Sequence, residues 1–317
     1  MSIKFKYISK QSRIDDIDIS GDSFTIFYGS NIDDRSNAVI NYFTTVGTIK
    51  HSNKIFYTQV NDSFSINEDI IKKKDIDKCL HNYINTSSNI IIDCTTLSYM
   101  EILTLLNFLN NIPMSIDVDL FYVEPVGYNN EDTKFEGMDF HLSYDSGRLA
   151  YIKPFFLETP LDNLNKEKAV IIVFLGFEDD RINTILERDD FNETYQEVFP
   201  ILAVPAFEYG WENISISKHI GLIDDRKLLY SPSDNPYSSY KLLNEFIKEI
   251  PYKQIVIMPF GTKPNTVASA IFMVNYKEKY IPNTGMASIA TQFDFPIKSE
   301  KRSYGVKEVH HYSLRIN

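Results

Sequence analysis

The residues with the most specific chemistry lie in the run 259–265, which reads Pro-Phe-Gly-Thr-Lys-Pro-Asn. Gly261 allows close approach of a ligand to the backbone, Thr262 supplies a hydroxyl and Lys263 a positive charge. Pro264 suits the first turn of a helix, whose positive dipole end would face the same point. The run therefore predicts a binding site for an anion such as a phosphate. The alternative is a plain helix cap with the lysine in solvent.

Polar turns follow three other apolar segments that end in the same way. Thr95, Thr96 and Ser98 come after the segment 89–93, where their hydroxyls could donate to a ligand, but no lysine accompanies them. The turns after Gly29 and Gly176 supply further polar or aromatic side chains. The resulting candidate ligand-binding residues are Gly261, Thr262, Lys263, Asn265, Thr95, Thr96, Ser98, Ser30, Asn31, Phe177, Glu178 and Arg181.

Two Asp-Asp-Arg triplets, at 33–35 and 179–181, offer paired carboxylates of the kind that bind Mg²⁺. Asp33 and Asp179 also stand where an N-cap residue accepts backbone N–H bonds, and an adjacent arginine can pair with a carboxylate. We favour capping over metal binding. We predict no metal site and no resident cofactor, with Mg²⁺ only under an enzymatic alternative, and we assign no catalytic residue.

The elements that must position these residues occur in matching pairs. An apolar strand that ends in glycine and then a polar turn appears at 24–29 and again at 170–176. A second pair of apolar strands, each followed by a turn and an apolar helix, lies at 89–109 and 254–274, and a third pair of strands ends in Pro125 and Pro296. Short continuous apolar runs between helical patterns are typical of parallel strands buried on both faces. The pattern predicts an α/β fold of two related Rossmann-like halves, with mainly parallel sheets flanked by helices.

The expected halves are 1–150 and 165–317, and they arise in this interpretation from an internal duplication. We also expect strands at 54–59 and 198–204 and helices at 75–84 and 238–249. The spacing between partners grows along the chain, which predicts an inserted loop in the second half at about 205–236. Tyr209 and Trp211 of that loop are expected either to cover a ligand or to pack. The polar stretch 128–168 is expected to be a surface excursion, and a hairpin at 141–152 stays undecided.

Composition limits the partners. The chain is 43% hydrophobic and 24% charged, as expected of a folded globular protein, and 43 acidic against 32 basic residues give a net charge of −11. That charge opposes attraction to nucleic acid and to anionic membranes, except at the locally basic tail 298–315. We expect this tail to be a solvated strand edge, and the alternative is a surface for an anion or a partner beside the Lys263 turn. The absence of a long apolar segment predicts a cytoplasmic protein without a membrane span.

The stretch 254–275 resembles the signature of the CARF family, Rossmann-like sensors of cyclic oligonucleotides and other nucleotide signals in bacterial and archaeal antiviral defence. In that signature a strand leads into a Gly-Gly-Thr-Lys turn and an apolar helix. Gly261, Thr262 and Lys263 match its last three positions, whereas Phe260 stands at the first glycine. The resemblance implies that the matching residues contact ligand phosphate. It also implies that the turn from Ser30 or Phe177 onward faces the base or the ribose.

We therefore expect a regulatory or sensor protein that binds a nucleotide or another phosphorylated small molecule, either as a homodimer or within a protein complex. Two alternatives stay open. One is a nucleotide-processing hydrolase or transferase that holds Mg²⁺ through the aspartates of the two triplets. The other is an interaction subunit of a multiprotein complex that has lost its ligand, because a fold does not fix a function.

Overall fold

The computed structural model describes residues 2–19, 21–84, 88–129, 142–145, 148–155, 168–252, 254–281, 284–299 and 302–317. The chain forms two compact units. Unit 1 contains Met1–Asp145 and Ile297–Asn317, and unit 2 contains Ser146–Pro296. Most of the predicted excursion at 128–168, including the start of the undecided hairpin, lies outside the described residues.

In the described part of unit 1, eight strands form one sheet in the order β1-β18-β7-β6-β2-β3-β4-β5. Its centre, β7-β6-β2-β3, is parallel, and the strands on both sides are antiparallel. The eight strands are β1 (Ile3–Gln11), β2 (Ser23–Tyr28), β3 (Thr48–Thr58), β4 (Ser63–Ile66), β5 (Asp69–Lys72), β6 (Asn89–Asp93), β7 (Ile116–Val123) and β18 (Val309–Ile316). Two short ribbons add β8 (Gly127–Tyr128) with β17 (Ser303–Tyr304) and β9 (Ser143–Asp145) with β16 (Ile297–Lys298).

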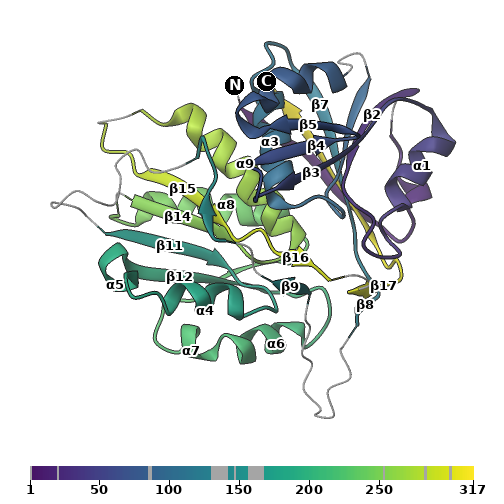
Figure 1. The fold of residues 1–317 in the computed structure, drawn as a ribbon. Helices are drawn as coiled ribbons and strands as arrows, with labels where there is room; N and C mark the ends of the chain where they lie inside the picture. The colour runs from purple at the N-terminus through teal and green to yellow at the C-terminus, as the bar shows by residue number, and fades with distance from the viewer. Residues whose placement is uncertain are drawn as a thin grey trace. The chain divides into compact units, whose positions relative to one another are not determined.

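Helices cover both faces of this sheet (Figure 1). Phe43 of α1 (Ala38–Val46) packs edge-on against Phe24 of β2 and Phe121 of β7, and all three side chains are fully buried. On α3 (Tyr99–Asn110), a capping box between Ser98 and Glu101 fixes the first turn. The remaining helical segments are η1 (Ile14–Asp16), η2 (Lys73–Asp75), α2 (Ile76–Leu80) and η3 (His81–Tyr83).

The sheet of unit 2 has the order β10-β15-β14-β11-β12-β13 over the described residues. Every neighbouring pair is parallel except β10 with β15. All six residues of the central strand β11, Ala-Val-Ile-Ile-Val-Phe, are buried, as expected where helices cover both faces. The strands are β10 (Ala150–Tyr151), β11 (Ala169–Phe174), β12 (Tyr195–Ala203), β13 (Leu229–Ser231), β14 (Gln254–Pro259) and β15 (Ser288–Phe293).

The helices of unit 2 lie on opposite sides of its sheet, with α8 and α9 on one side and α4 to α7 on the other (Figure 1). This is the arrangement that right-handed crossovers produce. Asn235 caps α8 through a bond from the Ser238 N–H. The helices are α4 (Asp180–Leu186), α5 (Phe191–Thr194), α6 (Trp211–Lys218), α7 (Ile220–Ile223), α8 (Pro236–Glu249) and α9 (Lys263–Lys279).

The α/β class is confirmed, and the strand order is Rossmann-like. Counted along the chain, the five parallel strands of unit 2 lie in the order 3-2-1-4-5. The predicted strand pairs occupy matching places, because β7-β6-β2-β3 of unit 1 corresponds in order and direction to β15-β14-β11-β12 of unit 2. The expected inserted loop at about 205–236 contains α6, α7 and β13. The antiparallel strands at both sides of the unit 1 sheet were not predicted.

The end of the chain differs from its prediction. We expected residues 297–317 in the second half and a solvated strand edge within them. Instead, β18 lies between β1 and β7 in unit 1, and seven of its eight residues are buried. The reason is that Val309, Tyr312, Leu314 and Ile316 fill the core of unit 1.

No helix in the described part of the chain combines the length and the apolar character that a membrane crossing requires.

Candidate functional site

In an open α/β sheet, ligands bind beyond the carboxyl ends of the strands, at the point where the strand order reverses. In unit 2 this point lies between β11 and β14, and in unit 1 the corresponding point lies between β2 and β6. Each predicted group of ligand-binding residues follows one of these four strands. The structure therefore brings Gly261, Thr262 and Lys263 to the same edge as Phe177, and it brings Thr95 and Thr96 to the same edge as Gly29.

The Gly-Thr-Lys turn of unit 2 forms the start of α9. Thr262 is the N-cap, and its side chain and that of Asn265 make a reciprocal capping box. The Thr262 hydroxyl also lies 2.7 Å from the Ser233 carbonyl oxygen, and Asn265 donates to Ser239 at 2.9 Å. These two polar side chains therefore serve the helix start. Lys263 is the first helical residue and is partly exposed.

The glycines of this edge are required by close packing. A Cβ atom on Gly261 would lie 2.8 Å from Asn265 Oδ1, and one on Gly176 would lie 2.6 Å from the Phe260 carbonyl oxygen. Ser215 of α6 donates to the Gly176 carbonyl at 2.8 Å. The inserted segment therefore holds the turn after β11 in place.

Aromatic side chains accompany that turn. Phe177 packs edge-on against Trp211 with ring centroids 5.6 Å apart, whereas Tyr209 is fully exposed. Trp211 was expected either to cover a ligand or to pack, and its contact with Phe177 is a packing contact. Glu178 is partly exposed beside Phe177.

Arg181 makes a buried ion pair in unit 2. Its Nε and Nη2 donate to the two carboxylate oxygens of Asp294 at 2.7 and 2.5 Å. The guanidinium carbon also lies 4.4 Å from the ring centroid of Phe260, which is 4% exposed. Asp179 stands at the N-cap of α4, as expected, but makes no side-chain cap bond. Arg181 thus links α4 to the residue that follows β15.

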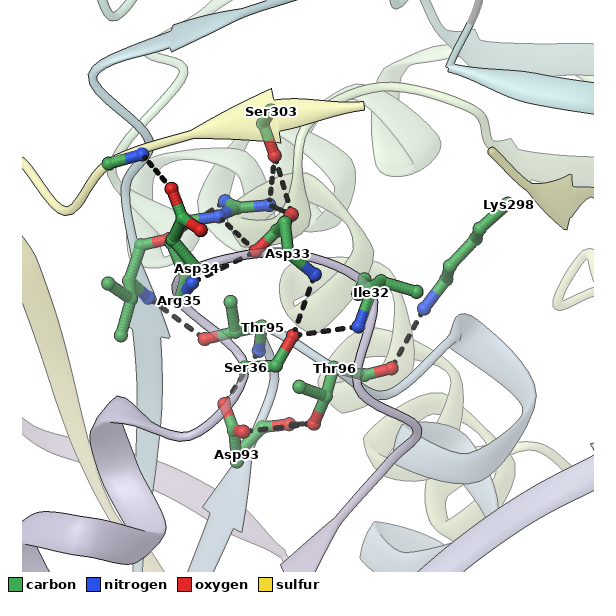
Figure 2. Close-up of polar contacts among 12 residues, drawn as sticks. Ile32, Asp33, Asp34, Arg35, Ser36, Asp93, Thr95, Thr96, Lys298 and Ser303 are labelled. Carbon is green, nitrogen blue, oxygen red and sulfur yellow. Dashed lines mark hydrogen bonds and ion pairs between the residues drawn. The ribbon is translucent and has the colours of Figure 1, made fainter. Parts of the chain in front are cut away.

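At the corresponding edge of unit 1, the hydroxyls of Thr95 and Thr96 bind the protein itself. Thr96 Oγ1 accepts from the Gly29 N–H at 2.8 Å. It also donates to Asp93 at 2.9 Å, and Thr95 Oγ1 accepts from the Val123 N–H at 3.0 Å (Figure 2). Both threonines are buried. They hold β2 and β7 against the end of β6. Of the other predicted residues, Ser98 caps α3, and Ser30 and Asn31 are exposed.

Asp33 and Arg35 of the first Asp-Asp-Arg triplet form a buried cluster with Ser303, whereas Asp34 is exposed. Arg35 Nη2 donates to Asp33 Oδ2 at 2.7 Å and to Ser303 Oγ at 2.9 Å, and Ser303 in turn lies 2.5 Å from Asp33 (Figure 2). Arg35 Nη1 donates to the Val123 carbonyl at 2.9 Å, and Asp34 accepts from the Gly305 N–H at 3.0 Å.

The prediction that Asp33 is the N-cap of a helix is wrong, although its Oδ1 does accept the backbone N–H of Arg35 at 3.1 Å. The residue at the N-cap of α1 is Asn37, which makes no side-chain cap bond. The Asp33 carboxylate instead forms an ion pair with Arg35. The Asp33 side chain is 0% exposed and that of Arg35 is 3% exposed, and the ion pair compensates for the burial of both charges. The cluster connects the turn after β2 to β7 and β17.

Lys298 is a residue that the sequence did not reveal. Its Nζ donates to the Thr96 carbonyl at 2.8 Å, so the edge of unit 1 has an ammonium group after all (Figure 2). The lysine lies 202 positions further along the chain than its partner. No local spacing rule connects residues so far apart, and the only sequence signal was the basic character of the tail.

The titration of Asp33 gives a testable prediction. Burial raises the pKa of Asp33. Hydrogen bonds from Arg35 and Ser303 and the charge of Arg35 together lower it by more than burial raises it, so the pKa of Asp33 lies below its usual value. A depressed carboxyl pKa stabilises the fold above the unfolded pKa of about 3.9, and this contribution is lost as the pH falls through the folded value. We expect the free energy of unfolding to fall more steeply with acidification in the wild type than in Asp33→Asn. Urea titrations between pH 6 and pH 3 measure this, and equal slopes would contradict it.

No protein-family model matches this chain, and no curated protein or solved structure with which it was compared matches it.

Proposed function

We propose that unit 2 binds a phosphorylated small molecule, most suitably a nucleotide, at the edge between β11 and β14. The observation that carries this proposal is the position of Lys263. It is the first residue of the 17-residue helix α9, directly beyond β14 and next to the point where the strand order reverses. A helix start presents backbone N–H groups and a positive dipole end, and a lysine there adds a full charge. On a chain with a net charge of −11, an anion must be captured by such a local arrangement.

The resemblance of 254–275 to the CARF signature supports a regulatory role over a catalytic one. On this proposal the protein is a sensor in prokaryotic antiviral defence, and nucleotide binding at Lys263 is the signal that it detects. The ligand phosphate would lie over the start of α9. Thr262 and Asn265 would act by holding that helix start in place, since their side chains already bind each other and neighbouring elements. Phe177 and Glu178, on the turn after β11, are the predicted partners for a base or a ribose.

Isothermal titration calorimetry tests this function. The full chain is titrated with inorganic phosphate, AMP, ATP, cyclic AMP and short cyclic oligoadenylates. We expect at least one nucleotide to bind, and Lys263→Ala to weaken it about ten- to hundredfold, because a hydrogen bond to a charged group contributes about 1.5–3 kcal/mol.

Lys279→Ala is the matched control. Lys279 is an exposed residue at the far end of the same helix, so this variant loses the same charge without touching the helix start. Its affinity should equal that of the wild type. Equal weakening by both variants would indicate a general charge effect. An unchanged affinity in Lys263→Ala would remove this site.

A ligand-free interaction subunit is the second candidate, and one observation favours it. Phe260 occupies the first glycine position of the CARF signature and is buried beneath Arg181, which is itself paired with Asp294. An aromatic ring there fills space that a glycine would leave to a ligand. If none of the nucleotides binds the folded wild type, this candidate replaces the sensor. The Mg²⁺-dependent enzyme has less support, because both carboxylate oxygens of Asp33 already accept bonds from Arg35.

A further inference from the structure

Three potential metal ligands meet in unit 1, whereas the proposed nucleotide site belongs to unit 2. Glu124 follows β7, Glu308 directly precedes β18, and His310 is the second residue of β18, so Glu308 and His310 are two positions apart and lie on one face of the extended chain. The two segments are held together, because Val309 pairs with Val123 and the Glu124 N–H donates to the Glu308 carbonyl at 2.7 Å. One ligand atom from each of the three side chains lies within 4.8 Å of the others.

The geometry suits a small divalent ion. His310 Nε2 lies 3.0 Å from Glu124 Oε2, and both residues are 1% exposed. In a tetrahedral zinc site with bonds of about 2.0–2.1 Å, neighbouring ligand atoms are about 3.3 Å apart. An ion could therefore take the place of the contact between His310 and Glu124, with only small movements of either side chain. Glu308 is partly exposed and supplies the third ligand at the accessible side.

Two lysines hold the carboxylates in place. Lys307 Nζ contacts Glu124 Oε1 at 3.0 Å, which is the oxygen that does not face His310. Lys10 Nζ contacts Glu308 Oε2 at 3.0 Å. Outer partners of this kind orient ligating carboxylates. They also compensate the two negative charges when no ion is bound, so the cluster is stable without metal and the bound ion must compete with their positive charge.

The ligand set selects the ion. An imidazole nitrogen suits zinc and its transition-metal neighbours, whereas Mg²⁺ and Ca²⁺ prefer oxygen ligands alone. We propose that Glu124, Glu308 and His310 form a binding site for a divalent transition-metal ion of the zinc class, with solvent at the remaining position. This site is independent of the proposed nucleotide function.

The test is titration of the untagged, chelator-treated full chain with ZnCl₂ by calorimetry, with the zinc content checked by mass spectrometry. We expect one zinc ion per chain and no comparable binding of Mg²⁺. His310→Gln should weaken zinc binding at least tenfold. His311→Gln is the control: His311 lies next in sequence and is equally buried, but the carboxylate that it contacts is Asp119, and it belongs to no cluster of three ligands among the described residues.

Glu308→Gln keeps the proposal testable if the buried His310 variant fails to fold. The Glu308 side chain is 26% exposed, so its replacement should leave the circular dichroism spectrum unchanged and still weaken zinc binding at least tenfold. Absence of stoichiometric zinc binding in the folded wild type would overturn the site. So would equal zinc affinity in wild type and Glu308→Gln, equal weakening by His311→Gln and His310→Gln, or equal affinity for Mg²⁺ and zinc.

Discussion

Replacing Arg35 with methionine is expected to lower the free energy of unfolding by about 3–5 kcal/mol, the cost of removing one partner from a buried ion pair. The substitution leaves the Asp33 carboxylate, whose side chain is 0% exposed, without its counter-charge. It also removes the bonds to Ser303 and to the Val123 carbonyl. Urea unfolding measures the change, and hydrogen exchange should show lost protection in β2, β7 and β17.

Arg13→Met is the matched control for this prediction. Arg13 and Asp15 are also two residues apart and form an ion pair, but their side chains are 73% and 60% exposed. Exposed pairs contribute at most about 1 kcal/mol. The double variant Asp33→Asn/Arg35→Met should recover part of the loss, since it no longer buries an unpaired charge. An equal cost in Arg13→Met and Arg35→Met, or no recovery in the double variant, would contradict this account of the cluster.

Replacing Arg181 with methionine is expected to destabilise unit 2 by about 3 kcal/mol, for the same reason. The Arg181 and Asp294 side chains are 11% and 4% exposed, so Asp294 would stay buried without its partner. The methionine can still pack on Phe260 but cannot reproduce the two bonds to the carboxylate. Hydrogen exchange of α4 and of the end of β15 measures the local loss, beside urea unfolding of the whole chain.

Arg188→Met controls for the loss of an arginine from the same unit. Arg188 pairs with Asp190, and their side chains are 45% and 49% exposed, so we expect a cost of at most about 1 kcal/mol. If Arg181→Met is as stable as Arg188→Met, the ion pair is not structural. Arg181 would then return to the candidate ligand-binding residues.

Local sequence was sufficient to predict the strands that carry the candidate sites. The runs that became β11 and β14 consist largely of β-branched and other apolar residues, and a strand buried on both faces requires such a run whatever its neighbours are. The Thr-Lys-Pro-Asn start of α9 was also readable, because capping depends on residues within one turn. Both signals are short in range, so one chain segment contains all of the information.

The partners of the polar side chains could not be predicted in this way. Ser303 reaches Asp33 across 270 positions, Lys298 reaches Thr96 across 202, and His310 reaches Glu124 across 186. Locally, Asp33 is a residue type common at helix caps, and the basic character of the tail is typical of a solvated strand edge. The order of the strands in the sheet decides which partner lies next to a buried charge. Only a partner within a few ångströms can compensate for the loss of hydration of that charge. The sequence by itself thus determined the strands and helix starts of this protein. Only its tertiary structure decided that the tail completes unit 1, turning the first triplet into a buried ion pair and bringing His310 beside two glutamates.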